Sequence, residues 1–136
     1  AGQRVLLMHG DNLCTRDEAY MAFRQQARNP AWQAQILAMP VEERLALAKQ
    51  LRQQSGEANT NKAEDIMDVT PEAVVETMQA HEVKIMIHGH THRPAVHDLT
   101  VDGEPARRYV IGDWRPGVGW QLRVEDDALT LESFAI

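Results

Sequence analysis

Three histidines follow two apolar runs of the chain, and their spacing could support metal chemistry. Gly89-His90-Thr91-His92 comes shortly after Lys84–Ile87, and His9-Gly10-Asp11 comes directly after Val5–Met8. Imidazole is the commonest protein ligand for divalent metals, and a small glycine beside it allows close backbone approach. We therefore expect His9, His90 and His92 to share one site, while polar loops with solvated histidines remain the simpler alternative.

The two apolar runs are typical of strands inside a sheet that is covered on both faces. Ligands bind beyond the carboxyl ends of such strands, where both histidine motifs stand. We expect the two strands to pair with each other and with strands near the C-terminus. One sheet edge and one apolar face should then stay open, with Val5, Leu7 or Ile85 more exposed than an apolar run suggests.

Helices are predicted between and after these strands. Thr15 is a candidate N-cap for a helix over 16–28, which Asn29-Pro30 would stop, and Thr70-Pro71-Glu72 opens a helix that reaches about His81. The pattern also predicts a short apolar segment over 32–39, a strong helix from Val41 to about Ser55, and a resumption of helix over 57–68.

The last forty residues favour two β-hairpins. Ala95–Val101 and Ala106–Ile111 flank Asp102-Gly103, a pair suited to positive φ, and Gly119–Val124 and Leu129–Phe134 flank Asp126-Asp127. Together with the helices, these segments predict an α/β fold.

Composition restricts the classes of function. The 136 residues fit one domain, and a net charge of −6 gives no electrostatic reason to bind nucleic acid. The only cysteine, Cys14, excludes an intrachain disulfide and is interpreted as a small buried residue. No apolar run approaches the ~18 residues of a membrane span, so a cytoplasmic protein is expected. The opening Ala-Gly-Gln suggests either a piece of a longer protein or processing.

The order Val-Leu-Leu-Met-His9-Gly-Asp, then Ile-His-Gly-His90-Thr-His92-Arg-Pro, resembles the last motifs of calcineurin-like metallophosphoesterases. Residues 9–20, Ser55, Asn59, Lys62 and 65–69 look like the UDP-2,3-diacylglucosamine hydrolase subfamily of lipid A synthesis. This resemblance implies the C-terminal part of a two-sheet sandwich, with a helical lid inserted over 16–68 and β-hairpins over 95–136.

The resemblance also implies chemistry. Two divalent cations, usually Mn²⁺, would activate water against the pyrophosphate of a lipid-linked nucleotide, releasing UMP and 2,3-diacylglucosamine 1-phosphate. It assigns His9, His90 and His92 as metal ligands, His90 also as the catalytic contact to a substrate phosphate, and Asp17, Ser55, Asn59 and Lys62 as substrate contacts. It places the protein in the cytoplasm, peripheral on the inner membrane.

The chain lacks several motifs of the family pattern. No Asp-x-His occurs in it, and its Gly112-Asp113 turn follows the histidine motif when the family order requires the reverse. Three histidines alone favour zinc, nickel or copper over a manganese pair. We therefore expect that the isolated chain is inactive and that a missing N-terminal half supplies the remaining ligands.

The predicted lid has a polar stripe and an apolar side. Arg52, Ser55, Asn59 and Lys62 would share one helical face if Gly56 does not break the helix, and this stripe suits a pyrophosphate or is a solvated face. The apolar residues form core or accept acyl chains at a membrane surface; they are Trp32, Ile36, Leu37, Met39, Leu45 and Leu51. Two rival functions stay open: a phosphodiesterase or nucleotide phosphatase of the same fold, and a non-catalytic metal- or lipid-binding module.

Overall fold

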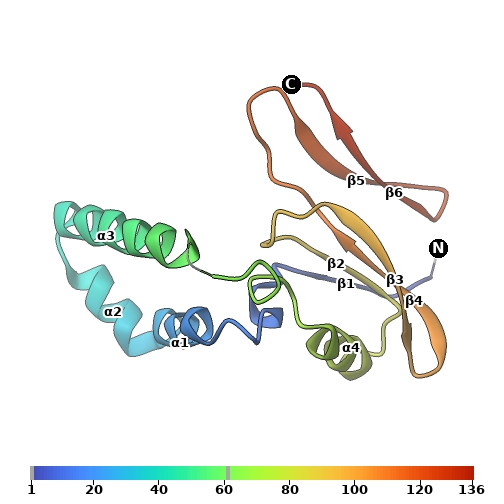
Figure 1. The fold of residues 1–136 in the computed structure, drawn as a ribbon, viewed down its shortest axis with the longest axis horizontal. Coiled ribbons are helices and arrows are strands. Elements are labelled where there is room, and N and C mark those ends of the chain that lie inside the picture. Colours follow the sequence, from blue (N-terminus) through green and yellow to red (C-terminus); the bar gives the residue numbers. More distant parts are fainter. Residues whose placement is uncertain (1, 61) are drawn as a thin grey trace. The chain divides into compact units, whose positions relative to one another are not determined.

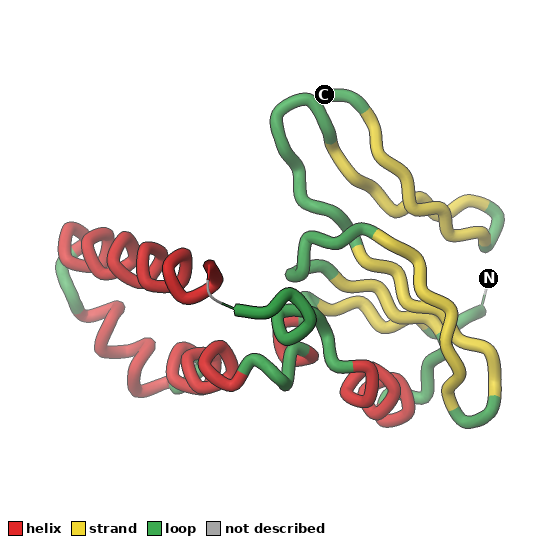
Figure 2. The backbone as a smooth tube through the Cα atoms, viewed as in Figure 1, coloured by secondary structure: helices red, strands yellow, loops and turns green. Residues whose placement is uncertain are grey.

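The computed structural model describes residues 2–60 and 62–136, which form two compact units. One unit combines the residues up to Cys14 with Asp68–Ile136 and contains the strands and both histidine motifs. The other spans Thr15–Met67 and is helical (Figures 1 and 2).

The first unit is built on a mixed four-stranded sheet in the order β1-β2-β4-β3. The strands β1 (Val5–Met8), β2 (Ile85–His88) and β4 (Glu104–Val110) run parallel, and β3 (Ala95–Val101) pairs antiparallel with β4. A separate antiparallel pair is formed by β5 (Gly119–Glu125) and β6 (Ala128–Phe134). The α/β class and the pairing of the two apolar runs are therefore confirmed. Of the two C-terminal hairpins expected to pair with these runs, only the first, β3 with β4, joins their sheet.

The register of the sheet brings the two histidine motifs to the same edge. Met8, the last residue of β1, pairs with His88, the last residue of β2, and His88 pairs with Val110 at the end of β4. Because these strands are parallel, His9 and Gly89 leave the sheet side by side. The second strand lies one residue later than predicted, so that His88 belongs to the strand and not to the loop.

Both hairpins turn within two residues, as the sequence predicts. Asp102 and Gly103 have φ of 55° and 76°, and Asp126 and Asp127 have φ of 47° and 65°. Positive φ at both central positions is the type I′ geometry, whose twist matches that of the flanking strands. Since no further residue is needed in either turn, the strands extend to the turns and β4 begins at Glu104, two residues earlier than expected.

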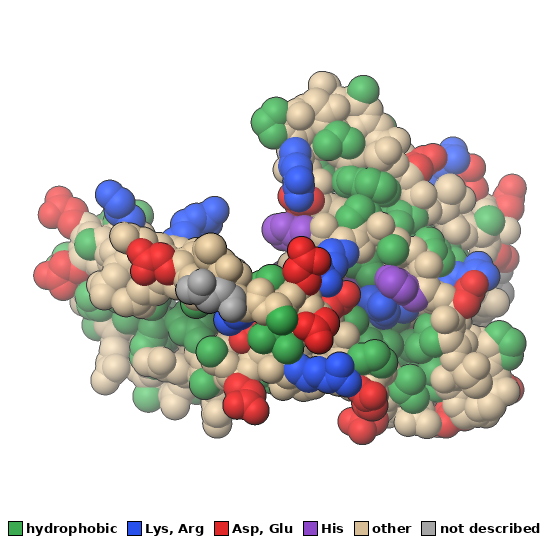
Figure 3. Space-filling model, in the orientation of Figure 1, with side chains coloured by type: hydrophobic (Ala, Val, Ile, Leu, Met, Phe, Trp, Pro, Cys, Tyr) green, Lys and Arg blue, Asp and Glu red, His purple; other side chains and the backbone are tan. Residues whose placement is uncertain are grey.

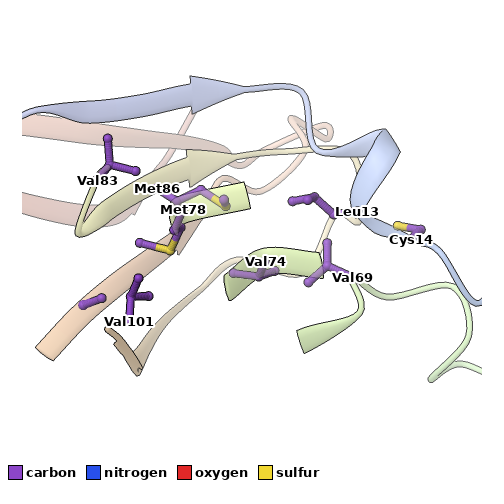
Figure 4. Packing of buried hydrophobic residues seen from close by; sticks show 9 residues of the cluster. Leu13, Cys14, Val69, Val74, Met78, Val83, Met86 and Val101 are labelled. Carbon is purple, nitrogen blue, oxygen red and sulfur yellow. The ribbon is translucent and has the colours of Figure 1, made fainter. Parts of the chain in front are cut away.

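Helix α4 (Pro71–Ala80) supplies the apolar side chains that cover the inner face of the sheet. Val74 and Met78 of α4 belong to one buried cluster with Met86 of β2 and Val101 of β3 (Figure 4). Leu13, from the short 3-10 helix Asp11–Leu13, and Cys14 belong to the same cluster. The interpretation of Cys14 as a small buried residue is therefore confirmed, with 2% of its surface exposed.

Strand β1 is open on its second face. Val5 is 41% and Leu7 72% exposed, whereas Leu6 and Met8 pack against the buried cluster. Burial on both faces holds for β2 at Met86 and Ile87 but is wrong for β1, because β1 is an edge strand whose alternate side chains point away from α4. The expected exposure at Val5 and Leu7 is confirmed.

The helical unit contains α1 (Glu18–Ala27), α2 (Pro30–Ala38) and α3 (Val41–Thr60). The predicted N-cap at Thr15 is wrong: Asp17 caps α1, because its Oδ1 accepts a hydrogen bond from the Tyr20 amide at 3.1 Å. Asn29 and Pro30 do follow the end of α1, and they also start α2, with the Asn29 side chain accepting from the Ala31 amide.

Helix α3 is longer than the sequence predicted. It passes through Gly56 and ends at Thr60, whose hydroxyl donates to the Gly56 carbonyl at 2.9 Å, and Gln53 bonds Glu57 one turn on. A single glycine costs a helix only about 1 kcal/mol, which the rest of a long helix can absorb. Residues 62–68 form turns, so the predicted resumption of helix there is wrong.

The surface has two properties that bear on its partners. No helix among the described residues is both long and apolar enough to cross a membrane. Acidic and basic side chains are interspersed on the face drawn in Figure 3.

Candidate metal centre

A backbone hydrogen bond joins the two histidine motifs just beyond the sheet. The amide of Gly89 donates to the carbonyl oxygen of His9 at 3.0 Å, which continues the pairing of β1 with β2 by one step. The position of His90 relative to His9 is therefore fixed by main-chain geometry as well as by side-chain packing.

His9 and His90 lie in contact. Their ring centroids are 4.9 Å apart and the rings meet edge to face at 62°. Nδ1 of His9 is 3.0 Å from Oδ1 of the buried Asp11, so the carboxylate sets the ring's orientation and Nε2 is the nitrogen left for a ligand. Carboxylate–histidine pairs of this kind orient imidazoles that bind metals.

His92 is exposed and faces a different carboxylate. Its Nδ1 lies 3.7 Å from Oδ2 of Asp113, and Nε of Arg115 donates to the same oxygen at 2.7 Å. This hydrogen bond is the main reason why the pKa of Asp113 is lowered. Asp113 therefore stays ionised beside His92.

Asp113 has no role in the family resemblance, because the Gly112-Asp113 turn stands in the wrong order for the family pattern. A usable signal was nevertheless present, since Asp113 follows β4, the third parallel strand of the sheet. Residues beyond the carboxyl ends of parallel strands meet at one edge, and applying this rule to every strand would have selected Asp113.

The metal-ligand set is incomplete within this part of the chain. Among the described residues, no three His, Cys, Asp or Glu side chains form a group that could hold a metal ion. The structure brings His9 together with His90 and leaves His92 beside Asp113. Neighbouring imidazoles with carboxylate partners fit a divalent cation chemically, but further ligands are required, and the assignment of the three histidines stays a prediction.

His88 lies beneath the histidine turn and is almost fully buried. Its Nδ1 lies 2.9 Å from the carbonyl oxygen of Gly89, and Nη1 of Arg108 lies 2.9 Å from its Nε2. Burial is the first cause that lowers the pKa of His88, and the charge of Arg108 lowers it further. The ring is therefore neutral near pH 7.

The predicted substrate contacts lie in the helical unit. Arg52, Ser55 and Asn59 are exposed residues of α3, spaced by about one turn each, and Gly56 does not interrupt them. Lys62 lies beyond the end of α3, and its Nζ is 2.8 Å from Oδ2 of Asp17. The four-residue stripe therefore divides into three helical residues and one cation that is already paired.

Comparison with known proteins identifies the family resemblance. No family profile matches the chain. A UDP-2,3-diacylglucosamine hydrolase from Chromohalobacter salexigens is 68% identical over 126 residues, which cover 93% of this chain and 51% of that protein. The expected resemblance is confirmed.

Other UDP-2,3-diacylglucosamine hydrolases are also similar to this chain. The protein from Cellvibrio japonicus is 57% identical and that from Stutzerimonas stutzeri 49% identical, each over 135 residues that cover 99% of this chain and 56% of the relative. The chain spans about half the length of the curated relatives it matches. The resemblance therefore includes both histidine motifs and the helical unit between them.

Proposed function

We propose that this chain is the C-terminal part of a hydrolase that cleaves the pyrophosphate of UDP-2,3-diacylglucosamine, releasing UMP and 2,3-diacylglucosamine 1-phosphate in lipid A synthesis. The observation that carries the proposal is the 68% identity to a UDP-2,3-diacylglucosamine hydrolase across nearly the whole chain. The contact between the His9 and His90 rings at a sheet edge supports it, because such edges carry the ligand sites of parallel sheets.

His9, His90 and His92 would contribute imidazoles to a pair of divalent cations, proposed to be Mn²⁺, together with ligands from an N-terminal half. Bound cations would lower the pKa of a water molecule and neutralise charge on the phosphoryl oxygens. Asp11 orients His9, and Oδ2 of Asp113 lies 3.7 Å from Nδ1 of His92. His90 would also contact a phosphate of the substrate. We propose that this chain alone is inactive.

The helical unit would hold the substrate. Arg52, Ser55 and Asn59 present one cation and two neutral hydrogen-bonding groups along α3, a combination suited to a phosphate and a sugar. Lys62 and Asp17 would complete this surface. Charge-assisted hydrogen bonds to phosphate are about twice as strong as neutral ones, so the cations would dominate the binding free energy.

The apolar side chains of the helical unit would meet acyl chains or the inner-membrane surface. Leu37, Val41 and Leu45 are 69%, 60% and 66% exposed. Val41 and Leu45 are one turn apart and share a face of α3. A cytoplasmic enzyme that is peripheral on the inner membrane fits these exposed apolar groups and a lipid-linked substrate.

The test is substrate selectivity of the complete protein that contains this chain. With Mn²⁺, it should release UMP from UDP-2,3-diacylglucosamine much faster than from UDP-glucose, and it should cleave bis(p-nitrophenyl) phosphate slowly. Equal rates on all three would favour a general phosphodiesterase. Manganese binding with no cleavage of any of them would favour a non-catalytic module.

A further inference from the structure

The ring of His88 has no part in the proposed ligand set, yet it lies next to both histidine motifs. It ends β2, is 1% exposed, and lies between β1 and β4 in the sheet. A buried polar side chain is costly unless its hydrogen bonds are made, so its partners indicate its role.

The partners of His88 define a single tautomer. The carbonyl oxygen of Gly89 can only accept a hydrogen bond, so Nδ1 of His88 must carry the proton. The guanidinium of Arg108 can only donate, so Nε2 must be the acceptor. Both contacts are 2.9 Å long, and together they fix the ring orientation.

The ring in turn fixes the peptide that begins the histidine turn. The carbonyl of Gly89 accepts from His88 and also from the Thr91 amide at 2.8 Å, while the Gly89 amide donates to His9. The turn needs this support, because His90 and His92 both adopt positive φ, of 68° and 56°. Positive φ is uncommon for residues other than glycine and persists where the surroundings enforce it.

The opposite motif also contacts the ring. Gly10 has φ of 97°, and a Cβ atom there would lie 2.7 Å from Nδ1 of His88. Only a glycine leaves room for the imidazole at this distance. His88 therefore touches the backbone on both sides of the His9–His90 contact.

We infer that His88, held as the neutral Nδ1–H tautomer by Arg108, is a positioning residue that fixes the Gly89 peptide and so sets the spacing of His9 and His90. The inference rests on the proposed function only in taking these two histidines as metal ligands. Replacing such supporting groups typically weakens metal affinity ten- to a hundred-fold.

The experiment uses the complete protein that contains this chain. Isothermal titration with Mn²⁺ should show about ten-fold weaker binding for His88→Leu and for Arg108→Leu. His88→Asn keeps a donor near the Gly89 carbonyl and should recover most of the affinity. His81→Leu, which removes the exposed histidine that directly follows α4, is the matched control and should bind like the wild type.

Nitrogen-15 spectra of the histidine rings give a readout that does not depend on metal. The His88 ring should show a protonated Nδ1 and a bare Nε2 in the wild type and lose this signature in Arg108→Leu. The ring signals of His9 and His90 should shift in the same variant, because their spacing changes.

Three results would overturn the inference. The first is a folded His88→Leu protein with wild-type Mn²⁺ affinity. The second is a His88→Asn protein whose Mn²⁺ affinity is as low as that of His88→Leu. The third is an Arg108→Leu protein whose histidine ring signals are unchanged. If His88→Leu does not fold, the ring spectra and the Mn²⁺ affinity of Arg108→Leu alone decide whether His88 is a positioning residue. If the wild type binds no Mn²⁺, the proposed function fails, and the ring spectra still decide the role of His88.

Discussion

The ammonium group of Lys62 lies 2.8 Å from Oδ2 of Asp17, and the two side chains are only 16% and 8% exposed. Asp17 divides its oxygens: Oδ1 caps α1 through the Tyr20 amide, and Oδ2 holds Lys62. One carboxylate therefore ties the start of α1 to the segment that follows α3. Both residues were predicted to contact substrate, so a phosphate reaching Lys62 would have to share it with Asp17.

Replacing Lys62 with Ala should lower kcat/KM of the complete enzyme about ten- to a hundred-fold, because a charge-assisted hydrogen bond contributes ~1.5–3 kcal/mol. Lys62→Arg keeps the positive charge, so its kcat/KM should fall less than that of Lys62→Ala. The kcat/KM of both variants is measured from the rate at which they hydrolyse UDP-2,3-diacylglucosamine. Wild-type kcat/KM for Lys62→Ala would mean that Lys62 serves only the ion pair.

Substitutions at Asp17 should separate its two roles. Asn is as good an N-cap as Asp, so Asp17→Asn should keep the cap of α1 and weaken only the contact with Lys62. Asp17→Ala removes both the cap and the contact with Lys62. Its free energy of unfolding should be a further ~0.5–2 kcal/mol lower, so that it unfolds at a lower denaturant concentration. Chemical unfolding of the complete protein checks this order. Equal stability of the two variants would contradict the capping role that Asp17 has in the structure.

Replacing His92 with Ala should abolish turnover and leave folding intact. The His92 side chain is exposed and lies outside the buried cluster, so its loss creates no cavity. Turnover at saturating Mn²⁺ and the thermal midpoint should be measured together. His97→Ala is the control, because that histidine is also exposed but lies on β3. Near-normal turnover of His92→Ala would remove His92 from the ligand set.

The double substitution Val41→Ser and Leu45→Ser should weaken binding to phosphatidylglycerol vesicles. Removing a buried apolar side chain from a lipid contact costs roughly 1.5–3 kcal/mol, so two should weaken partitioning at least ten-fold. Val124→Ser on β5 is the matched control, because Val124 is equally exposed but belongs to the other unit. Identical sedimentation of all three proteins with vesicles would exclude this face of α3 as a lipid contact.

The sequence predicted the elements well because its local signals agreed. The hairpin at Asp102-Gly103 needs positive φ, and residues that tolerate it stand at those positions. The two apolar runs pair with each other in parallel, as the sequence predicts. An error at a helix end arises where Thr15 and Asp17 are both good caps and only the chain path decides which side chain meets an amide.

The site was predictable in its histidines and less so in their supporting groups. His9 and His90 were placed together by the rule that strand ends converge. Arg108 could not be connected to His88 from the sequence, because their hydrogen bond depends on the register of β2 against β4. The pairing of Lys62 with Asp17 likewise spans 45 residues and follows from how the helical unit closes on itself.

The burial of Cys14 allows its thiol to report when the core of this chain opens. Its thiol is the only one in the sequence and belongs to the cluster beneath the sheet, with Leu13 and Val74. A thiol-reactive dye can modify it only when that cluster opens, so the labelling rate measures the population of opened molecules. If the proposed cations bind at the neighbouring strand ends, they should slow that labelling without any contact to the sulfur.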